Sequence, residues 1–267
     1  MTSGSVPADE LLALLAERRG TGVRSRKLSL SWHDVRTRSL EMLYGLRASD
    51  LAAGAAVAFP GRLRPERLCG ELGALAGGYR IVAAGGDVTI VDDVRDAATT
   101  DRPPETVVVI DGTAAGRWVP LDRFAARGVA WAASHAALPQ PVALVSADGL
   151  RPGEHVLLRA ACDRVVARSV LVAAAFAGAD LFVGEHEMDA AVELDRTGAE
   201  VVATDVADVG RIAALAAAHR TTAARALRRL GRGPLGGRLR LILVDEPPPD
   251  EVRAVLARIG VDVVTTA

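Results

Sequence analysis

The carboxylates Asp245 and Glu246 are the clearest candidates for metal chemistry in this sequence. They follow the apolar segment 241–244, Leu-Ile-Leu-Val. Nucleotide-binding proteins place a magnesium-binding carboxylate after a buried strand in this way, together with a phosphate-binding loop of the form G-x-x-x-x-G-K-S/T. The sequence lacks that loop, and its only lysine, Lys27, lies far upstream. We therefore predict that Asp245 and Glu246 are a solvated pair.

Two other polar groups have both a chemical and a simpler interpretation. The segment 185–187, Glu-His-Glu, contains metal-ligand residue types, but adjacent residues rarely converge on one ion, so we predict a surface turn. Asp163, Arg164 and Arg168 suit either an anion site at a helix N-terminus or a solvated helix face. Neither a G-x-G-x-x-G nor a G-x-S-x-G motif occurs. We predict no catalytic residue, no cofactor-binding residue and no metal ligand.

The segment 220–232 is the densest basic part of the chain. At helical spacing, four arginines of this segment fall on one side, namely Arg225, Arg228, Arg229 and Arg232. These side chains either contact an anion or an acidic protein partner, or form a solvated helix face.

Composition excludes several classes of function. The net charge is −1, so no overall field favours nucleic acid or an anionic membrane. The two cysteines and five histidines have no metal-ligand or disulfide spacing. The N-terminus lacks the pattern of a signal peptide, and the apolar run 165–183 is interrupted by Arg168, Gly178 and Asp180. We expect a cytoplasmic protein that binds neither nucleic acid nor membrane.

Short apolar segments alternate with helical segments along most of the chain, a pattern typical of a mainly parallel sheet covered on both faces. The predicted strands are 27–30, 55–59, 80–83, 88–91, 106–110, 155–158, 181–183, 201–203, 239–244 and 261–264. The predicted helices are 8–19, 31–46, 64–76, 163–176, 187–197, 208–218, 221–230 and 250–259. Ser31 and Asp34 form a capping pattern at the start of the second helix.

The segments 45–82 and 149–183 resemble each other as a weak internal repeat, each having a strand, a helix and a strand after Gly-Leu-Arg. Any two βαβ units have this order of elements, so the resemblance could also arise without a true internal repeat. We predict an α/β fold of two packed, mainly parallel βα units, residues 1–140 and 141–267.

Four segments, in the right order, resemble the long-chain acyl-CoA synthetase branch of the adenylate-forming, or AMP-binding, enzymes. Residues 30–35 (LSWHDV) resemble the early strand and helix of that family, and residues 55–78 resemble the next strand and helix with its LGALAAGA ending. Residues 150–157 (LRPGEHVL) are similar to LRPGDRVL, and residues 235–242 (LGGRLRLI) to the start of LGGRLRFLVSGGAPL. The resemblance implies the fold of the family's N-terminal domain.

The same resemblance implies that the family's chemistry is missing. The family has a phosphate loop ending in lysine where residues 138–142 are Leu-Pro-Gln-Pro-Val. The histidine of its PLAH motif corresponds to Arg164, and two glycines of its adenine-contacting SGGAP turn correspond to Asp245 and Glu246. The family's GYGxTE motif and its small C-terminal domain would follow Ala267, so the chain resembles a truncated domain. No functional residue of the family can be transferred to this sequence.

These observations predict a degenerate acyl-CoA synthetase-like pseudoenzyme that binds an acyl ligand, such as a fatty acid, or a protein partner. One alternative is an acid–CoA (AMP-forming) ligase, acting on fatty or aryl acids with a second polypeptide. Another is an unrelated α/β binding protein. We also expect a homodimer whose contact lies around residues 131–145, where Trp131, Leu138 and Leu144 are apolar.

Overall fold

A computed structural model describes residues 4–52, 54–101, 103, 106–111, 118–135, 143–147, 149–159, 164–185, 188–218 and 238–266. Contacts between residues divide the chain into two compact units. One contains residues 6–19 and 32–144, here called the N-terminal unit, and the other contains residues 1–5, 20–31 and 145–267, here called the C-terminal unit. A two-stranded sheet pairs β1 (Gly4–Pro7) with β9 (Ala143–Ser146).

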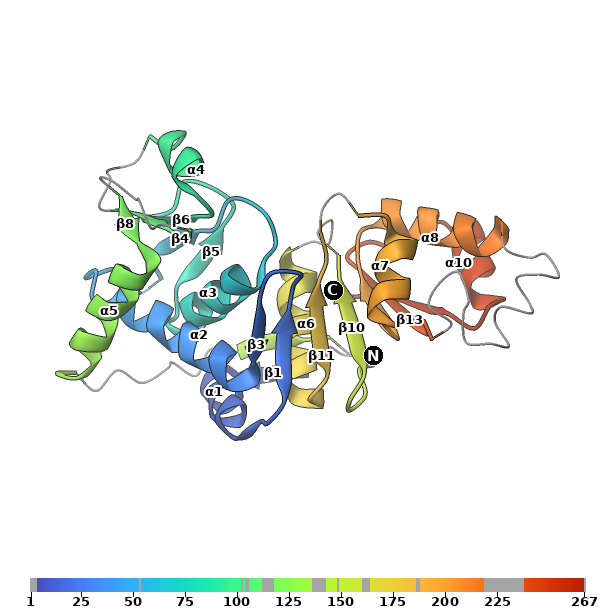
Figure 1. Ribbon diagram of the computed structural model, residues 1–267, viewed down its shortest axis with the longest axis horizontal. Helices are drawn as coiled ribbons and strands as arrows, with labels where there is room; N and C mark the ends of the chain where they lie inside the picture. The colour runs from blue at the N-terminus through green and yellow to red at the C-terminus, as the bar shows by residue number, and fades with distance from the viewer. Residues whose placement is uncertain are drawn as a thin grey trace. The chain divides into compact units, whose positions relative to one another are not determined.

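The N-terminal unit is built on a five-stranded parallel sheet in the order β5-β4-β6-β7-β8. The strands are β4 (Ala56–Ala58), β5 (Arg80–Val82), β6 (Val88–Val91), β7 (Val107–Val109) and β8 (Val119–Pro120). The helices are α1 (Ala8–Glu17), α2 (Trp32–Arg47), α3 (Pro65–Ala76), α4 (Val94–Ala98) and α5 (Leu121–Ala132). Figure 1 shows α2, α3 and α5 on one side of this sheet and α4 on the other.

Alternate residues of the strands explain the two layers of this unit. Val57, Ile90 and Val108 pack with Phe59 and Phe124 in one core cluster. On the opposite face, a second and smaller cluster contains residues of β6, β7 and α4: Val91, Ala97, Val107 and Val109. The helices of the larger layer approach each other closely at glycines, because a Cβ on Gly128 of α5 would lie 2.3 Å from the backbone nitrogen of Gly45 in α2.

The C-terminal unit is built on a seven-stranded sheet in the order β14-β13-β12-β10-β11-β2-β3. The strands are β2 (Thr21–Arg24), β3 (Ser29–Ser31), β10 (His155–Leu158), β11 (Asp180–Val183), β12 (Val201–Ala203), β13 (Leu241–Val244) and β14 (Asp262–Thr265). All neighbouring pairs are parallel except the hairpin of β2 and β3. The helices with described bounds are α6 (Arg164–Ala177), α7 (Ala190–Thr197), α8 (Val206–Ala218) and α10 (Asp250–Ala257).

The two sheets share a topology at their centres, in agreement with the predicted internal repeat. In each, the first strand of the repeat is central and the second lies beside it, and the next strand in the chain, which follows the repeat, lies on the other side: β5-β4-β6 and β11-β10-β12. In the C-terminal unit, where both connections contain a helix, right-handed crossovers place α6 and α7 on opposite faces of the sheet.

The predicted mainly parallel α/β architecture is confirmed, with local corrections. The predicted strand 27–30 is wrong in its first two residues, because Lys27 and Leu28 form a turn in which both backbone N–H groups donate to the hydroxyl of Ser25. The strands β1, β2, β8 and β9 and the helices α4 and α5 were not predicted. Residues 20–31 belong to the C-terminal unit, whereas the predicted boundary after residue 140 grouped them with the N-terminal part.

Among the described residues, no helix combines the length and apolar composition that crossing a bilayer requires.

Candidate functional site at the carboxyl ends of the seven-stranded sheet

The carboxyl end of β10 is the place where this fold would hold a ligand. The chain leaves β10 through α6 toward β11, then returns through α7 to β12 on the other side of β10. In open α/β sheets, ligands bind outside the carboxyl ends of the strands at such a switch point. The residues that follow the strands here are therefore the candidates for function.

Arg159 follows β10 directly and is buried at this switch point. Its Nε donates to Oδ2 of Asp208 at 2.9 Å, and its Nη1 donates both to Glu193 and to the backbone oxygen of Met188, the latter at 2.9 Å. Glu193 comes from α7 and Asp208 from α8. The exposed fractions are 6% for Arg159, 4% for Glu193 and 1% for Asp208. The Arg159 guanidinium is thus buried with two carboxylates, one from the helix that precedes β12 in the chain and one from the helix that follows it.

Both carboxylates have further donors. Oδ2 of Asp208 accepts from the Thr204 hydroxyl at 3.0 Å, and Oδ1 accepts from the exposed Arg211 at 2.7 Å. Oε1 of Glu193 accepts from the backbone N–H of Glu185 at 2.6 Å. Two arginines and two carboxylates give this group no net charge, so the network is satisfied internally. Removing any one member of such a buried network would leave an uncompensated charge and destabilise the fold.

The network keeps its charges at neutral pH. Burial opposes the charged form of Asp208, but the hydrogen bond and charge of Arg159, helped by Thr204, outweigh it and hold the pKa of Asp208 below its usual value. Burial likewise opposes the charged form of Arg159, and the hydrogen bonds to Asp208 and Glu193 outweigh it, so the pKa of Arg159 is raised. The ion pair is therefore intact at neutral pH, and acidification weakens it.

The rim around this network is acidic. Asp245 and Glu246 follow β13 and are exposed, as predicted for a solvated pair. The side chain of Asp205, after β12, accepts from the backbone N–H of Asp208 at 2.8 Å, and Glu185, after β11, lies 3.7 Å from Arg26. Within the described parts of the chain, no group of histidine, cysteine or carboxylate side chains could hold a metal ion. The exposed carboxylates of Asp245 and Glu246 repel phosphate groups, whereas Arg26 and Arg211 at the same rim pair with carboxylates.

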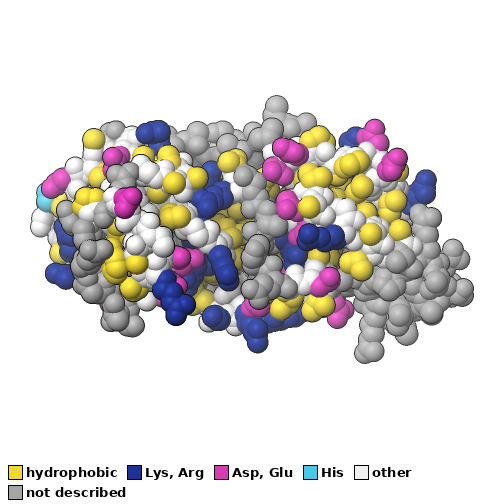
Figure 2. Space-filling model, turned by 90° about the horizontal axis from the view of Figure 1, so that it is seen from above, with side chains coloured by type: hydrophobic (Ala, Val, Ile, Leu, Met, Phe, Trp, Pro, Cys, Tyr) yellow, Lys and Arg dark blue, Asp and Glu magenta, His cyan; other side chains and the backbone are white. Residues whose placement is uncertain are grey.

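The other predicted contact residues are only partly covered by the structure. Arg225, Arg228, Arg229 and Arg232 lie outside the described residues, as do His186 and Glu187 of the segment 185–187. Arg164 is the first residue of α6, and Asp163 lies outside the description. Where the surface is described, basic and acidic side chains are interspersed on the face shown in Figure 2.

Sequence reasoning missed Arg159, Glu193 and Asp208. The available signal was a charged residue, Arg159, directly after the fully apolar end of a predicted strand, because a charge at that position usually meets a partner or a ligand. Its partners are separated from it by 34 and 49 residues and could not be identified by spacing.

No family model and no curated protein sequence matches this chain. Solved structures do match its fold. The N-terminal domain of FACL13 from Mycobacterium tuberculosis has a TM-score of 0.63 at 15% identity, covering 97% of this chain and 75% of that one. The anthranilate CoA ligase AuaEII, in complex with anthranoyl-AMP, has a TM-score of 0.69 at 12% identity, covering 98% of this chain and 60% of that one.

An amide bond synthetase, McbA from Marinactinospora thermotolerans, has a TM-score of 0.65 at 14% identity, with 98% of this chain covered and 59% of that chain. This chain therefore spans about three fifths of the length of such ligases. The fold is that of the N-terminal domain of acyl-CoA synthetase-like, adenylate-forming enzymes. At these identities the likeness concerns the fold.

Proposed function

We propose that this chain, which has the N-terminal-domain fold of adenylate-forming ligases, is a non-catalytic protein that acts by binding a protein partner. The observation that carries the proposal is the chemistry of the carboxyl edge of the seven-stranded sheet. The buried Arg159 at this edge is neutralised by Glu193 and Asp208, and the rim carries Asp205, Asp245 and Glu246.

Adenylation requires donors on the phosphate groups and positive charge on the transferred group in the transition state. Arg159 directs its described hydrogen bonds to protein oxygens. Asp245 and Glu246 stand where the family resemblance aligns an adenine-contacting glycine turn, and the segment 138–142 has neither a glycine nor a lysine. Bringing the phosphates of ATP to this edge would place them near the like charges of Asp245 and Glu246, which is unfavourable.

We expect no ATP–pyrophosphate exchange with any of a panel of fatty and aryl acids, because Arg159 is neutralised by Glu193 and Asp208 and the edge exposes Asp245 and Glu246. The assay uses the full chain with magnesium and radiolabelled pyrophosphate. An active acyl-CoA synthetase assayed in parallel provides the positive control. Exchange above the no-enzyme background would contradict the proposal. Exchange that requires an added second polypeptide would instead support an acid–CoA ligase formed by two chains.

A groove between α2 and α5 in the N-terminal unit supports the choice of a protein partner. It has a volume of about 900 Å³ and lies between the Ala125, Ala126 and Val129 side of α5 and a charged stretch of α2. Val129 is 53% exposed. The groove is open to solvent along its length, so an acyl chain lying in it would keep one side in water, whereas a protein surface would cover it.

The occupant that we propose for this groove is a second copy of the chain. Its walls carry both signs of charge, with Arg38 beside Glu41 on α2 and Asp122 on α5. A two-fold contact would place Arg38 of one copy opposite acidic residues of the other, which makes the surface self-complementary. Trp131 lies on the same helix and stacks on His135, with ring centroids 4.3 Å apart. The homodimer contact expected near residue 131 is thus proposed to extend along α5.

We expect a dimer in sedimentation analysis at protein concentrations up to about 100 μM, the range that detects a weak interface. Val129→Asp should shift the equilibrium to monomer by placing a charge in the contact. Val192→Asp is the matched control, because Val192 is 56% exposed on α7 of the other unit. A monomeric wild-type protein, or equal dimerisation of both variants, would contradict this surface. A monomer that binds a fluorescent fatty-acid probe would favour the acyl ligand.

A further inference from the structure

Arg38 on α2 is partly buried, yet no hydrogen-bond or ion-pair partner for its side chain lies among the described residues. Other partly or fully buried arginines of the N-terminal unit are paired. The side chains of Arg36 and Arg47 donate to backbone oxygens, and those of Arg64 and Arg67 donate to carboxylates. A guanidinium that has lost part of its hydration is stabilised by an acceptor. Arg38 is therefore suited to an acceptor from outside its own chain.

The position of Arg38 is beside the first turn of α5. A cavity of about 30 Å³ adjoins the α2–α5 groove, and four residues line both of them: Arg38, Glu41, Leu121 and Ala125. Leu121 and Ala125 belong to the first two turns of α5, and Asp122 lies between them. A group that binds Arg38 from outside would thus lie near Asp122.

The charges of the groove make Arg38 important for association. Among the described residues that line the groove, Arg38 is basic, whereas Asp34, Glu41 and Asp122 are acidic. If two copies met at this surface, their acidic residues would repel one another unless the arginine of each copy met an acid of the other. Asp122 is exposed on the α5 wall, and its Oδ1 accepts from the backbone N–H of Arg123 at 2.7 Å. Its Oδ2 is thus the acceptor that a second copy can offer.

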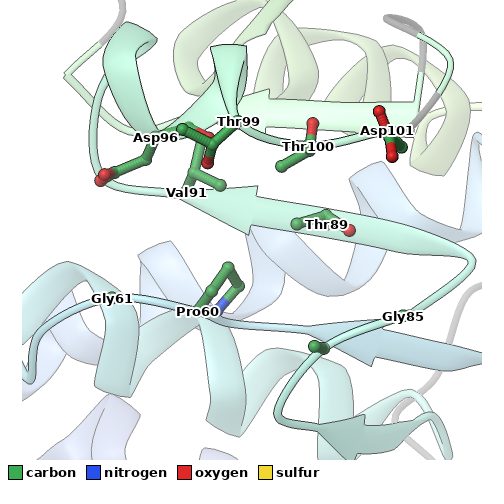
Figure 3. A pocket seen from close by; sticks show the side chains of 10 residues that line it. Pro60, Gly61, Gly85, Thr89, Val91, Asp96, Thr99, Thr100 and Asp101 are labelled. Atoms are coloured by element: carbon green, nitrogen blue, oxygen red, sulfur yellow. The ribbon is translucent and has the colours of Figure 1, made fainter.

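The hollow on the α4 side of the five-stranded sheet lacks this combination of charges. It has a volume of about 350 Å³, with Asp96 and Asp101 on one side and Pro60 on the other (Figure 3). Neither arginine nor lysine is among the described residues that line it. Its two carboxylates are exposed and can be satisfied by water, so the hollow gives no indication of a partner. Asp96 is therefore a suitable control residue.

We infer that Arg38 of each copy forms an ion pair with Asp122 of the other copy, and that this pair determines recognition between the copies. The inference rests on the proposed dimer and adds the residues that select a second copy. A two-fold axis produces the pair twice, because each contact is repeated in the reverse direction. One charge reversal therefore introduces two like-charge contacts, whereas complementary reversals in two different chains restore both pairs.

Sedimentation velocity of the full chain tests the pair with Arg38→Asp and Asp122→Arg. Each variant is studied alone and in an equimolar mixture in which one of them carries a fluorescent label. Each variant alone should dimerise about tenfold or more weakly than the wild-type protein. The mixture should form a heterodimer with a dissociation constant within about threefold of the wild-type value. The double variant Arg38→Asp/Asp122→Arg should also regain the dimer.

Asp96→Arg is the matched control for Asp122→Arg, because it reverses an exposed carboxylate of the same unit outside the groove. It should dimerise like the wild-type protein, and Arg38→Asp/Asp96→Arg should not regain the dimer. Thermal melts establish that each variant is folded. A folding defect cannot explain recovery in the mixture, because each chain there keeps its own substitution.

The outcomes separate this inference from the proposed dimer. If Val129→Asp abolishes the wild-type dimer but the mixture associates no better than either variant alone, the pair is wrong and the dimer surface stands. Undiminished dimerisation of Arg38→Asp or Asp122→Arg alone would likewise overturn the pair. A monomeric wild-type protein would overturn both the dimer and the pair.

Discussion

Replacing Arg159 by methionine will lower the free energy of unfolding by about 3–5 kcal/mol at neutral pH. Methionine preserves much of the length of the side chain but removes the charge between Glu193 and Asp208. Both carboxylates are buried and would lose their common donor. An uncompensated buried charge is far more costly than the net value of the intact pair. Chemical denaturation of the wild-type and the variant, followed by circular dichroism, measures the difference.

The destabilisation should shrink as the pH falls. In the wild-type protein the pKa of Asp208 is held low, so its stabilising contribution is present above the ordinary carboxyl range and is lost as the pH falls through the folded-state pKa. Without Arg159, burial dominates and disfavours the charged carboxylate. Protonation then relieves the variant while it weakens the wild-type protein, so the two stability curves converge on acidification.

Arg211→Met is the control for this experiment. Arg211 contacts the same Asp208, but its side chain is 71% exposed, so its ion pair is screened by water. We expect its loss to cost less than about 1 kcal/mol. A similar cost for both variants, or a destabilisation by Arg159→Met that does not depend on pH, would show that the network does not have the role assigned to it.

Gly128→Ala will destabilise the N-terminal unit by about 1–3 kcal/mol, although alanine is the better helix former. A Cβ at Gly128 would lie 2.3 Å from the nitrogen of Gly45 and 2.6 Å from the carbonyl carbon of Tyr44. These are backbone atoms of α2, so relief requires α5 to move away from α2 as a whole. Differential scanning calorimetry, which can resolve separate transitions of the two units, measures the change.

Gly210→Ala provides the opposite case. Gly210 lies within α8, and a Cβ built there meets nothing within 4 Å. Alanine should therefore stabilise the protein by about 0.5–1 kcal/mol through helix propensity and the lower entropy of the unfolded chain. If both substitutions raised the melting temperature, the close crossing of α2 and α5 would be refuted.

The sequence by itself was sufficient for the class of fold and for most of its elements. Strands such as 88–91, 155–158 and 201–203 have the predicted bounds, because short β-branched and apolar runs between polar turns are a local signal. The helix after Ser31 was predicted from its capping pattern, which is also a local signal. The exposed positions of Asp245 and Glu246 also followed from local order, since they come directly after a buried strand.

Only the tertiary structure decided which segments meet. The strand β2, within residues 20–31, pairs with β11 in the C-terminal unit, although the residues that adjoin this segment on both sides belong to the N-terminal unit. The Arg159 network joins a strand end to two helices, and the Gly45–Gly128 crossing joins α2 to α5. The periodicity of apolar residues gives information only about residues that are close to one another in the sequence. The partner of a buried charge or of a helix glycine is set by sheet order and crossover direction, which are properties of the whole chain.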